Sequence, residues 1–294
     1  MNRGMLYAIG AYLFWGMFPV YFKQLQQVAA LEVIGHRIVW SFLGLAAVVM
    51  FSREAGTLLR NIRRVRVLGT YTVAAVLIAI NWLVFVWAVN NGHVVESSLG
   101  YFIAPLTSVL FGVAFLHERM RTWQWVAIAL AAAGVLYQAL SLGTVPWIAL
   151  TLAMSFGLYG LVKKIAPLGA VHGLTLETGL LLPPALIYLL YLERTGEGAF
   201  LHAGAAIDGL LLGAGIVTTL PLLLFASATK RIPLSLIGLL QYMTPTFHFL
   251  LGVLLYAEPF ARVRAIGFGL VWLALVIFSA EGWRARRAPP VVAD

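Results

Sequence analysis

The chain carries one sequence pattern twice, about 140 residues apart. The stretch at 98–118 reads SLGYFIAPLTSVLFGVAFLHE and the stretch at 238–258 reads GLLQYMTPTFHFLLGVLLYAE, which aligns Pro105 with Pro245. Each copy of the pattern contains five apolar segments. Because five is an odd number, a second copy that crosses a membrane five times begins on the opposite side from the first. The pattern therefore predicts an inverted repeat, an architecture common among membrane transporters.

The composition excludes an ordinary soluble domain. The chain has 294 residues, of which 62% are hydrophobic and 11% are charged, and its mean hydropathy is +0.92. A soluble domain has about 25% charged residues, so this chain has too few polar side chains to cover a globule. Cysteine is absent, which excludes a disulfide framework and a thiolate metal site. We therefore expect an integral membrane protein.

Ten apolar segments are long enough to span a membrane, which takes about 20 helical residues. They lie near 4–22, 31–51, 67–89, 96–116, 123–141, 146–163, 173–192, 208–228, 234–256 and 263–281. Their apolar runs are continuous, unlike the alternating segments of a transmembrane β-barrel. The predicted fold is an all-α membrane protein with ten transmembrane helices as two inverted five-helix repeats. The predicted units are a first repeat at 1–141, a second, inverted repeat at 142–283 and a disordered, cytoplasmic basic tail at 284–294.

The basic residues predict the orientation in the membrane. With the N-terminus in the cytoplasm, 15 of the 20 Lys and Arg residues lie on the cytoplasmic side, in agreement with the positive-inside rule. The Arg-rich stretch at 53–66 could be a nucleic-acid patch, but between two apolar spans a loop facing anionic lipid headgroups is favoured. We expect a multi-pass protein of the bacterial inner (plasma) membrane with both termini cytoplasmic. Its partners would include membrane lipid and no nucleic acid.

Polar residues inside the predicted spans are candidate site residues, because a polar group in a bilayer is costly. Asn81 lies midway along the third span, where its amide either bonds a neighbouring helix or lines a cavity. Arg37 and Glu177 occupy matching positions in the two halves, and each either reaches its membrane interface or faces water. His248 is either a packed residue with satisfied hydrogen bonds or a proton relay.

Pro105 and Pro245 lie inside their spans, where proline removes a backbone hydrogen bond and bends or breaks a helix. Broken helices at matching positions of two halves predict a binding site near the middle of the membrane. Tyr101 precedes the first proline, and Gln241 and Tyr242 precede the second. We expect their hydroxyl, amide and aromatic groups to converge there.

Glu118 and Glu258 occupy matching positions at the ends of the fourth and ninth spans. A carboxylate at a short turn can accept hydrogen bonds from the backbone N–H groups that open a helix. We therefore expect each of these residues to cap the helix that follows it in the chain.

Motifs of several other protein classes are absent from the sequence. It contains no Walker A motif, no H-E-x-x-H and no G-x-S-x-G, nor a pair of Asp motifs that could hold Mg²⁺. We expect no enzymatic activity, no metal and no cofactor. Two alternatives stay open. An integral-membrane enzyme acting on a lipid-linked substrate would need converging acids, and a non-transporting membrane scaffold would not need polar groups and broken helices in both halves.

Six segments carry a resemblance to a known family. They are AYLFWGMFPVYFK (11–23), EVIGHRIVWS (32–41), NWLVFVWAVN (81–90), ESSLGYFIAPL (96–106), GIVTTLPL (215–222) and QYMTPT (241–246). In combination, across roughly residues 3–283, they resemble the RarD proteins, EamA-type transporters of the drug/metabolite transporter superfamily. The resemblance implies ten spans, two inverted five-helix halves, a central cavity and the transport or export of small organic molecules or drugs.

These observations together predict a secondary transporter, an exporter or a facilitator, that works by alternating access. Its small-molecule substrates would be amphipathic organic solutes such as amino acids, aromatic metabolites or drugs. The candidate substrate-binding residues are Trp15, Arg37, Trp40, Asn81, Trp82, Tyr101, Tyr159, Gln241 and Tyr242. The aromatic residues would supply apolar faces, the amides would orient polar groups, and Arg37 would attract a carboxylate. For coupling to protons, Glu177 is the first candidate carrier and His248 the second.

Overall fold

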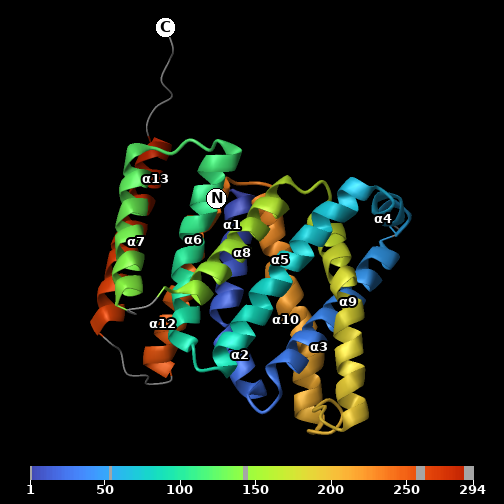
Figure 1. Ribbon diagram of the computed structural model, residues 1–294. Coiled ribbons are helices and arrows are strands. Elements are labelled where there is room, and N and C mark those ends of the chain that lie inside the picture. Colours follow the sequence, from blue (N-terminus) through green and yellow to red (C-terminus); the bar gives the residue numbers. More distant parts are fainter. Residues whose placement is uncertain (1, 53–54, 142–144, 256–261, 288–294) are drawn as a thin grey trace.

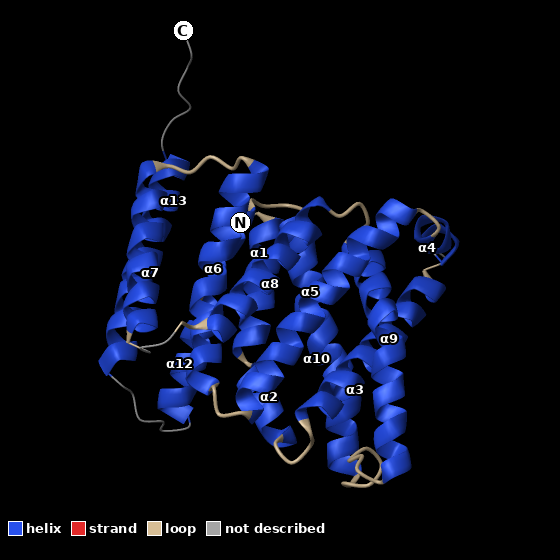
Figure 2. Ribbon diagram, viewed as in Figure 1, coloured by secondary structure: helices blue, strands red, loops and turns tan. Residues whose placement is uncertain are grey.

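The structure is a computed structural model that describes residues 2–52, 55–141, 145–255 and 262–287. Within these ranges the chain forms helices and no strands (Figures 1 and 2), which confirms the predicted all-α class. The elements are α1 (Arg3–Gly16), α2 (Phe18–Phe22), the 3₁₀ helix η1 (Lys23–Leu25), α3 (Ala30–Phe51), α4 (Ala55–Ile62), α5 (Val65–Asn90), α6 (Val94–Leu116), α7 (Thr122–Leu140), α8 (Trp147–Ile165), α9 (Ala170–Thr195), α10 (Ala205–Thr229), α11 (Leu234–Gln241), α12 (Met243–Leu250), the π-helix η2 (Leu251–Leu255) and α13 (Arg262–Arg287).

Nine helical stretches of the described chain are long and apolar enough to span a membrane. α1, α2 and η1 together form the first of them, and α11, α12 and η2 together form the ninth. A shorter apolar stretch at Ala265–Glu281 lies within α13, so the chain is a multi-pass membrane protein with the ten-helix arrangement that the sequence predicts. α13 continues to Arg287, which is inside the segment predicted as a disordered tail, and residues 288–294 lie outside the described ranges.

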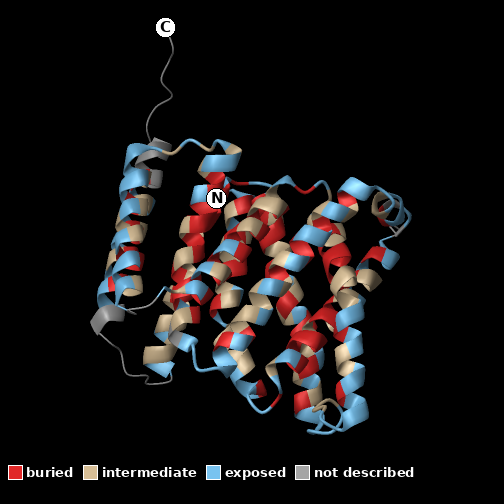
Figure 3. Cartoon of the chain, viewed as in Figure 1, coloured by how far each residue is buried: buried red, intermediate tan, exposed pale blue. Residues whose placement is uncertain are grey.

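Equivalent helices of the two halves pack against each other. α3 packs on α9, α6 on α11 and α7 on α13, and each of these pairs joins the same span of the two halves. α1, the first span of the first half, packs on α10, the third span of the second half. In the same way α8, the first span of the second half, packs on α5, the third span of the first. In Figure 1, α7 and α13 stand together at one end of the molecule, and the start of α1 and the end of α13 lie at the same edge as α4. Figure 3 shows buried residues gathered in the central helices and exposed residues along much of α7.

Glycines allow the two halves to approach closely. Gly157 on α8 faces α6, where an added Cβ atom would lie 2.5 Å from Thr107 Oγ1. Gly215 on α10 faces α3, where an added Cβ atom would lie 2.5 Å from Trp40 Cβ. Each of these contacts joins a helix of the first half to a helix of the second, and small residues at such contacts are the usual means of helix association in membranes. The two glycines therefore set the separation of the halves.

Glu118 caps a helix, but not the predicted one. Its Oε1 accepts a hydrogen bond from the Leu234 N–H at 2.7 Å, and its Oε2 accepts from the Ser235 N–H at 2.8 Å and the Ser235 hydroxyl at 2.6 Å. These groups open α11 in the second half, whereas the sequence predicted a cap on α7, the next long helix. The cause is the packing of α6 on α11, which brings the end of one helix to the start of the other. Its repeat mate Glu258 lies outside the described residues.

The ninth span is interrupted as predicted, but the fourth is not. α11 ends at Gln241 and α12 begins at Met243, just before Pro245. α6, in contrast, is continuous through Pro105. Proline is tolerated inside membrane helices where neighbouring groups satisfy the freed backbone. The prediction of matched breaks in both halves is therefore wrong for α6.

Replacing Glu118 with Ala should destabilise the protein. The change leaves two backbone N–H groups at the start of α11 without their acceptor, and a buried group that loses its partner costs about 1–3 kcal/mol. We expect a lower midpoint of thermal unfolding for the purified protein in detergent. Glu193→Ala is the matched control, because Glu193 and its partner His202 are both exposed. An unchanged midpoint for Glu118→Ala would contradict the capping role.

The charge bias predicts that both termini face the cytoplasm. A reporter fused to the C-terminus should lie on the cytoplasmic side, and a reporter inserted after Gly92, between α5 and α6, should lie outside. The measurement uses paired reporters, one active only in the cytoplasm and one active only beyond the membrane. Both fusions on one side would exclude the ten-span topology.

Candidate substrate cavity

A cavity of about 1400 Å³ lies between the two halves. Its lining comes chiefly from α1, α2, α3, α5 and α6 of the first half and from α8, α11 and α12 of the second. The lining extends from the buried Gln241 to the exposed residues Gln26, Gln27 and Asn90. These exposed residues lie before α3 and at the end of α5, so the cavity is open at this edge. A concave site with many apolar and aromatic side chains and few polar ones is the usual form of a small-molecule site.

The opposite edge is closed by contacts between the halves. There the Arg231 guanidinium carbon lies 5.0 Å from the centroid of the Tyr7 ring. The Tyr71 hydroxyl accepts a hydrogen bond from the Leu168 N–H at 2.9 Å, and Glu118 caps α11. The structure thus has one open edge and one closed edge.

Three lysines gather at the closed edge. Lys230, which follows α10, donates a hydrogen bond to the Ala166 carbonyl, and Lys164 donates to the Ile232 carbonyl at 2.6 Å. Burial, and after it the positive charges of Lys163 and Lys164, lower the pKa of Lys230 from its ordinary value. The mutual repulsion of these cations opposes closure of this edge. The hydrogen bonds of Lys164 and Lys230 to backbone carbonyls, and the ion pair of Lys163 with Glu177, offset it.

Seven of the residues predicted from the sequence line the cavity. They are Trp15, Arg37, Asn81, Trp82, Tyr101, Gln241 and His248. They come from α1, α3, α5, α6, α11 and α12, so the fold brings together residues that are far apart in the sequence. Their roles in binding stay predictions.

Three other candidate residues lie outside the cavity lining. Trp40 packs at the contact of α3 with α10, and its indole N–H donates to His36 Nδ1 at 3.1 Å. Tyr242 is 1% exposed and packs in an apolar cluster with residues of α6, α7 and α13. Tyr159 is fully buried on α8, where its hydroxyl contacts Glu177. All three lie in spans that contribute to the cavity, but their side chains pack against other helices.

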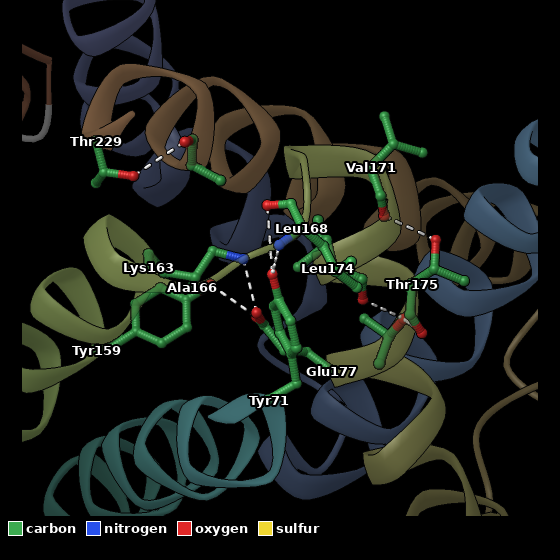
Figure 4. A network of polar contacts seen from close by, with 12 residues as sticks. Tyr71, Tyr159, Lys163, Ala166, Leu168, Val171, Leu174, Thr175, Glu177 and Thr229 are labelled. Atoms are coloured by element: carbon green, nitrogen blue, oxygen red, sulfur yellow. Dashed lines mark hydrogen bonds and ion pairs between the residues drawn. The ribbon is translucent and has the colours of Figure 1, made fainter. Parts of the chain in front are cut away.

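Glu177 is held in a buried polar network and does not line the cavity (Figure 4). Its Oε1 lies 2.6 Å from the Lys163 ammonium, and its Oε2 accepts a hydrogen bond from the Tyr159 hydroxyl at 3.0 Å. The Lys163 ammonium lies 5.8 Å from the centroid of the Tyr71 ring, so the network joins α5 of the first half to α8 and α9 of the second. Neither alternative posed for Glu177, a membrane interface or water, describes its surroundings, because its partner is a buried cation.

Lys163 is a site residue that the sequence did not predict, because a lysine near the end of a span is expected on the cytoplasmic side of the membrane. Lys163 lies within α8 and is 3% exposed. One signal could have found it. Tyr159 and Lys163 are four residues apart and share a face of the helix, and the following span carries an acid, Glu177. A buried acid and a buried base on neighbouring helices favour pairing, since either charge alone would be costly.

His248 supplies a hydrogen bond that the first span cannot make for itself. In a regular helix the Trp15 carbonyl would accept from the N–H of the residue four positions later, but that residue is Pro19, which has no N–H. His248 Nε2 lies 3.0 Å from this carbonyl. Because a carbonyl can only accept, Nε2 must carry the proton. The break between α1 and α2 is thus satisfied from α12, which favours the packed alternative for His248 over a proton relay.

Arg37 reaches the cavity from α3. Its Nε donates a hydrogen bond to Thr218 Oγ1 on α10 at 2.7 Å. Its guanidinium carbon lies 4.5 Å from the centroid of the Trp82 ring and 5.2 Å from that of Phe22, within the range of cation–π attraction. Thr218 was not predictable from the sequence, because its contact with Arg37 depends on the packing of two helices about 180 residues apart.

Asn81 both joins two helices and lines the cavity. Its Nδ2 donates to the Leu152 carbonyl at 2.9 Å and to Ser155 Oγ at 3.0 Å, both on α8. Gln241 lines the cavity from the end of α11, with its Oε1 3.5 Å from the Ser108 hydroxyl. Both placements posed for Asn81, at a neighbouring helix and at a cavity, therefore describe the same side chain.

Comparison with known proteins identifies the family. Residues 2–139 match the EamA-like transporter family. An uncharacterized transporter of Vibrio cholerae is 46% identical over 98% of this chain and 95% of its own length. Protein RarD of Escherichia coli is 43% identical over 97% of each chain. One solved crystal structure shares the fold with a TM-score of 0.70 at 18% identity, covering 97% of this chain and 99% of that chain. The chain therefore belongs to the RarD proteins of the EamA-like transporter family, within the drug/metabolite transporter superfamily.

Proposed function

We propose that this membrane transporter is a secondary transporter, an exporter or a facilitator, that moves small amphipathic organic solutes by alternating access. The observation that carries the proposal is the cavity between the two halves, which is open at one edge and closed at the other. A similarly long relative from Vibrio cholerae is also named a transporter. A non-transporting scaffold would not need a large solute-sized space between the two halves.

We further propose that the protein lies in the bacterial inner membrane with both termini in the cytoplasm. The bias of basic residues toward that side supports this orientation. The open edge carries the connections from α2 to α3 and from α5 to α6, whereas α1 begins at the closed edge. In this orientation the cavity faces away from the cytoplasm.

Alternating access requires the contacts at the closed edge to separate. Three of them join the first half to the second: Tyr7 with Arg231, Glu118 with α11, and Tyr71 with Leu168. Each of these contacts is between helices or at helix ends, and none belongs to the hydrogen-bond ladder of a helix. The edge can therefore open by movement of one half against the other, with every helix kept intact.

The solute would lie among aromatic and amide side chains. Trp15, Trp82 and Tyr101 offer apolar faces on three different helices. The Oδ1 of Asn81 has no hydrogen bond in the described part of the chain, nor has the Nε2 of Gln241. One acceptor and one donor are therefore available to orient polar groups of a solute.

Removing either amide should reduce transport. Asn81→Ala and Gln241→Ala each delete a polar contact to the solute, worth about 1 kcal/mol, so we expect a loss of about fivefold to tenfold in the rate at low solute concentration. The measurement is solute uptake by liposomes that contain the purified variants. Ser155→Ala is the matched control. It removes the Ser155 hydroxyl that accepts a hydrogen bond from Asn81, and Ser155 does not line the cavity. Equal losses in Ser155→Ala and Asn81→Ala would show that the Asn81 amide serves helix packing alone.

Coupling to protons is proposed to involve Glu177 rather than His248. Glu177 belongs to a network that joins the halves near the closed edge, so opening of this edge would bring water to the carboxylate. Glu177→Gln should abolish accumulation driven by a pH gradient and permit exchange of solute down its own gradient. Because this change leaves Lys163 buried without its partner, which costs about 3–5 kcal/mol, the double variant Glu177→Gln/Lys163→Gln is measured beside it. Uphill transport that survives in either variant would remove Glu177 as the carrier.

A further inference from the structure

Arg37 brings a positive charge into the cavity without an acidic residue in the lining that the structure describes. The cavity lining, all of it within the described residues, includes the cationic side chains of Arg37 and Lys23 and no Asp or Glu. Lys23 is exposed and lies at the open edge, whereas Arg37 is half-buried on α3. The buried cation Lys163, by comparison, has a carboxylate 2.6 Å away. A charge inside a membrane protein is normally paired, so an unpaired Arg37 calls for a partner that the described chain does not supply.

The surroundings of Arg37 hold its guanidinium group in place and leave its outer edge available. Nε is engaged by Thr218 at 2.7 Å, and the rings of Trp82 and Phe22 lie against the guanidinium group. No hydrogen bond or ion pair within the described residues engages its two terminal nitrogens. A guanidinium group fixed through Nε presents two parallel N–H donors, the geometry that binds a carboxylate or another planar oxyanion with two hydrogen bonds.

The rest of the lining suits an uncharged, apolar body. Trp82 and Trp15 offer aromatic surface, and the polar side chains of the lining include the neutral amides of Asn81 and Gln241. An ammonium group of a solute would find no carboxylate in the lining, and it would be repelled by Arg37. Resting on the transport function proposed above, we infer that the solute is an organic anion, with one carboxylate or similar oxyanion bound by Arg37 and an aromatic or aliphatic body without a balancing ammonium group.

The inference predicts discrimination by charge among ligands of one shape. The probes form three sets with phenyl, indolyl and hexyl bodies, and each set holds the carboxylate, the matching alcohol, the matching amine and the α-amino acid. Binding to the purified protein in detergent is measured by calorimetry. We expect at least one set in which the carboxylate binds tenfold or more tightly than its three counterparts. Equal binding of carboxylate and amino acid in every set, or the absence of binding by all carboxylates, overturns the inference.

Variants of Arg37 separate its charge from its shape. Arg37→Gln should weaken carboxylate binding tenfold or more and leave alcohol binding unchanged. Arg37→Lys keeps the charge but loses the paired donors, so its loss should be smaller than that of Arg37→Gln. Thr218→Val removes the hydrogen bond to Nε and should weaken carboxylates and not alcohols. The matched control is Arg66→Gln, which removes one exposed positive charge remote from the cavity and should leave all affinities unchanged. Carboxylate binding retained in Arg37→Gln would contradict the assignment.

Transport by liposomes distinguishes this inference from the proposed function. Selective uptake of the carboxylate that binds supports both. Uptake of alcohols and amines above that of liposomes without protein, with no preference for the carboxylate, overturns the anion site and leaves the transporter. Selective binding of a carboxylate that is lost in Arg37→Gln, without uptake of any probe, supports the anion site and counts against transport.

Discussion

The scarcity of water inside the membrane governs this structure, because the backbone polar groups of a span must find their partners within the protein. The Trp15 carbonyl loses its regular helical donor at Pro19 and accepts a hydrogen bond from His248 on α12. The opening N–H groups of α11 bond Glu118 at the end of α6. In both cases the partner comes from the other half. Helix ends and breaks are therefore places where the two halves are joined, in addition to bonds between helices such as that of Arg37 with Thr218.

The sequence predicted the number and placement of the spans, because continuous apolar runs of the right length have few alternatives in a membrane protein. It also predicted seven residues that line the cavity, since polar and aromatic side chains deep in a span have few other environments available. It could not predict which face of a helix meets which neighbour. Trp40 and Tyr242 lie in the right spans and pack elsewhere. Glu118 has the right chemistry and caps a helix about 115 residues away from it.

Repeated sequence has not produced repeated local structure. Pro105 and Pro245 are equivalent, yet α6 is continuous and the ninth span is broken before its proline. The first span is broken as well, whereas its counterpart α8 is not. The two broken spans pack on each other, as α1 contacts both α11 and α12. One side of the cavity is thus built from interrupted helices tied by His248, and the side formed by α6 and α8 is built from continuous ones. Each half therefore contributes one broken and one continuous span, so the difference distinguishes the two sides of the cavity and not the two halves.

Arg37 also has an electrical consequence. An empty cavity carries its positive charge, whereas a bound monoanion would cancel it. Moving one elementary charge through a membrane potential changes the free energy by about 2.3 kcal/mol per 100 mV. The transition of the loaded protein between its outward-open and inward-open states would therefore depend little on the membrane potential. The same transition of the empty protein would depend on it strongly. In a cell with a negative interior, the voltage would hold the empty cavity toward the cytoplasm, where it would load next, and the resting potential alone would bias the cycle toward export.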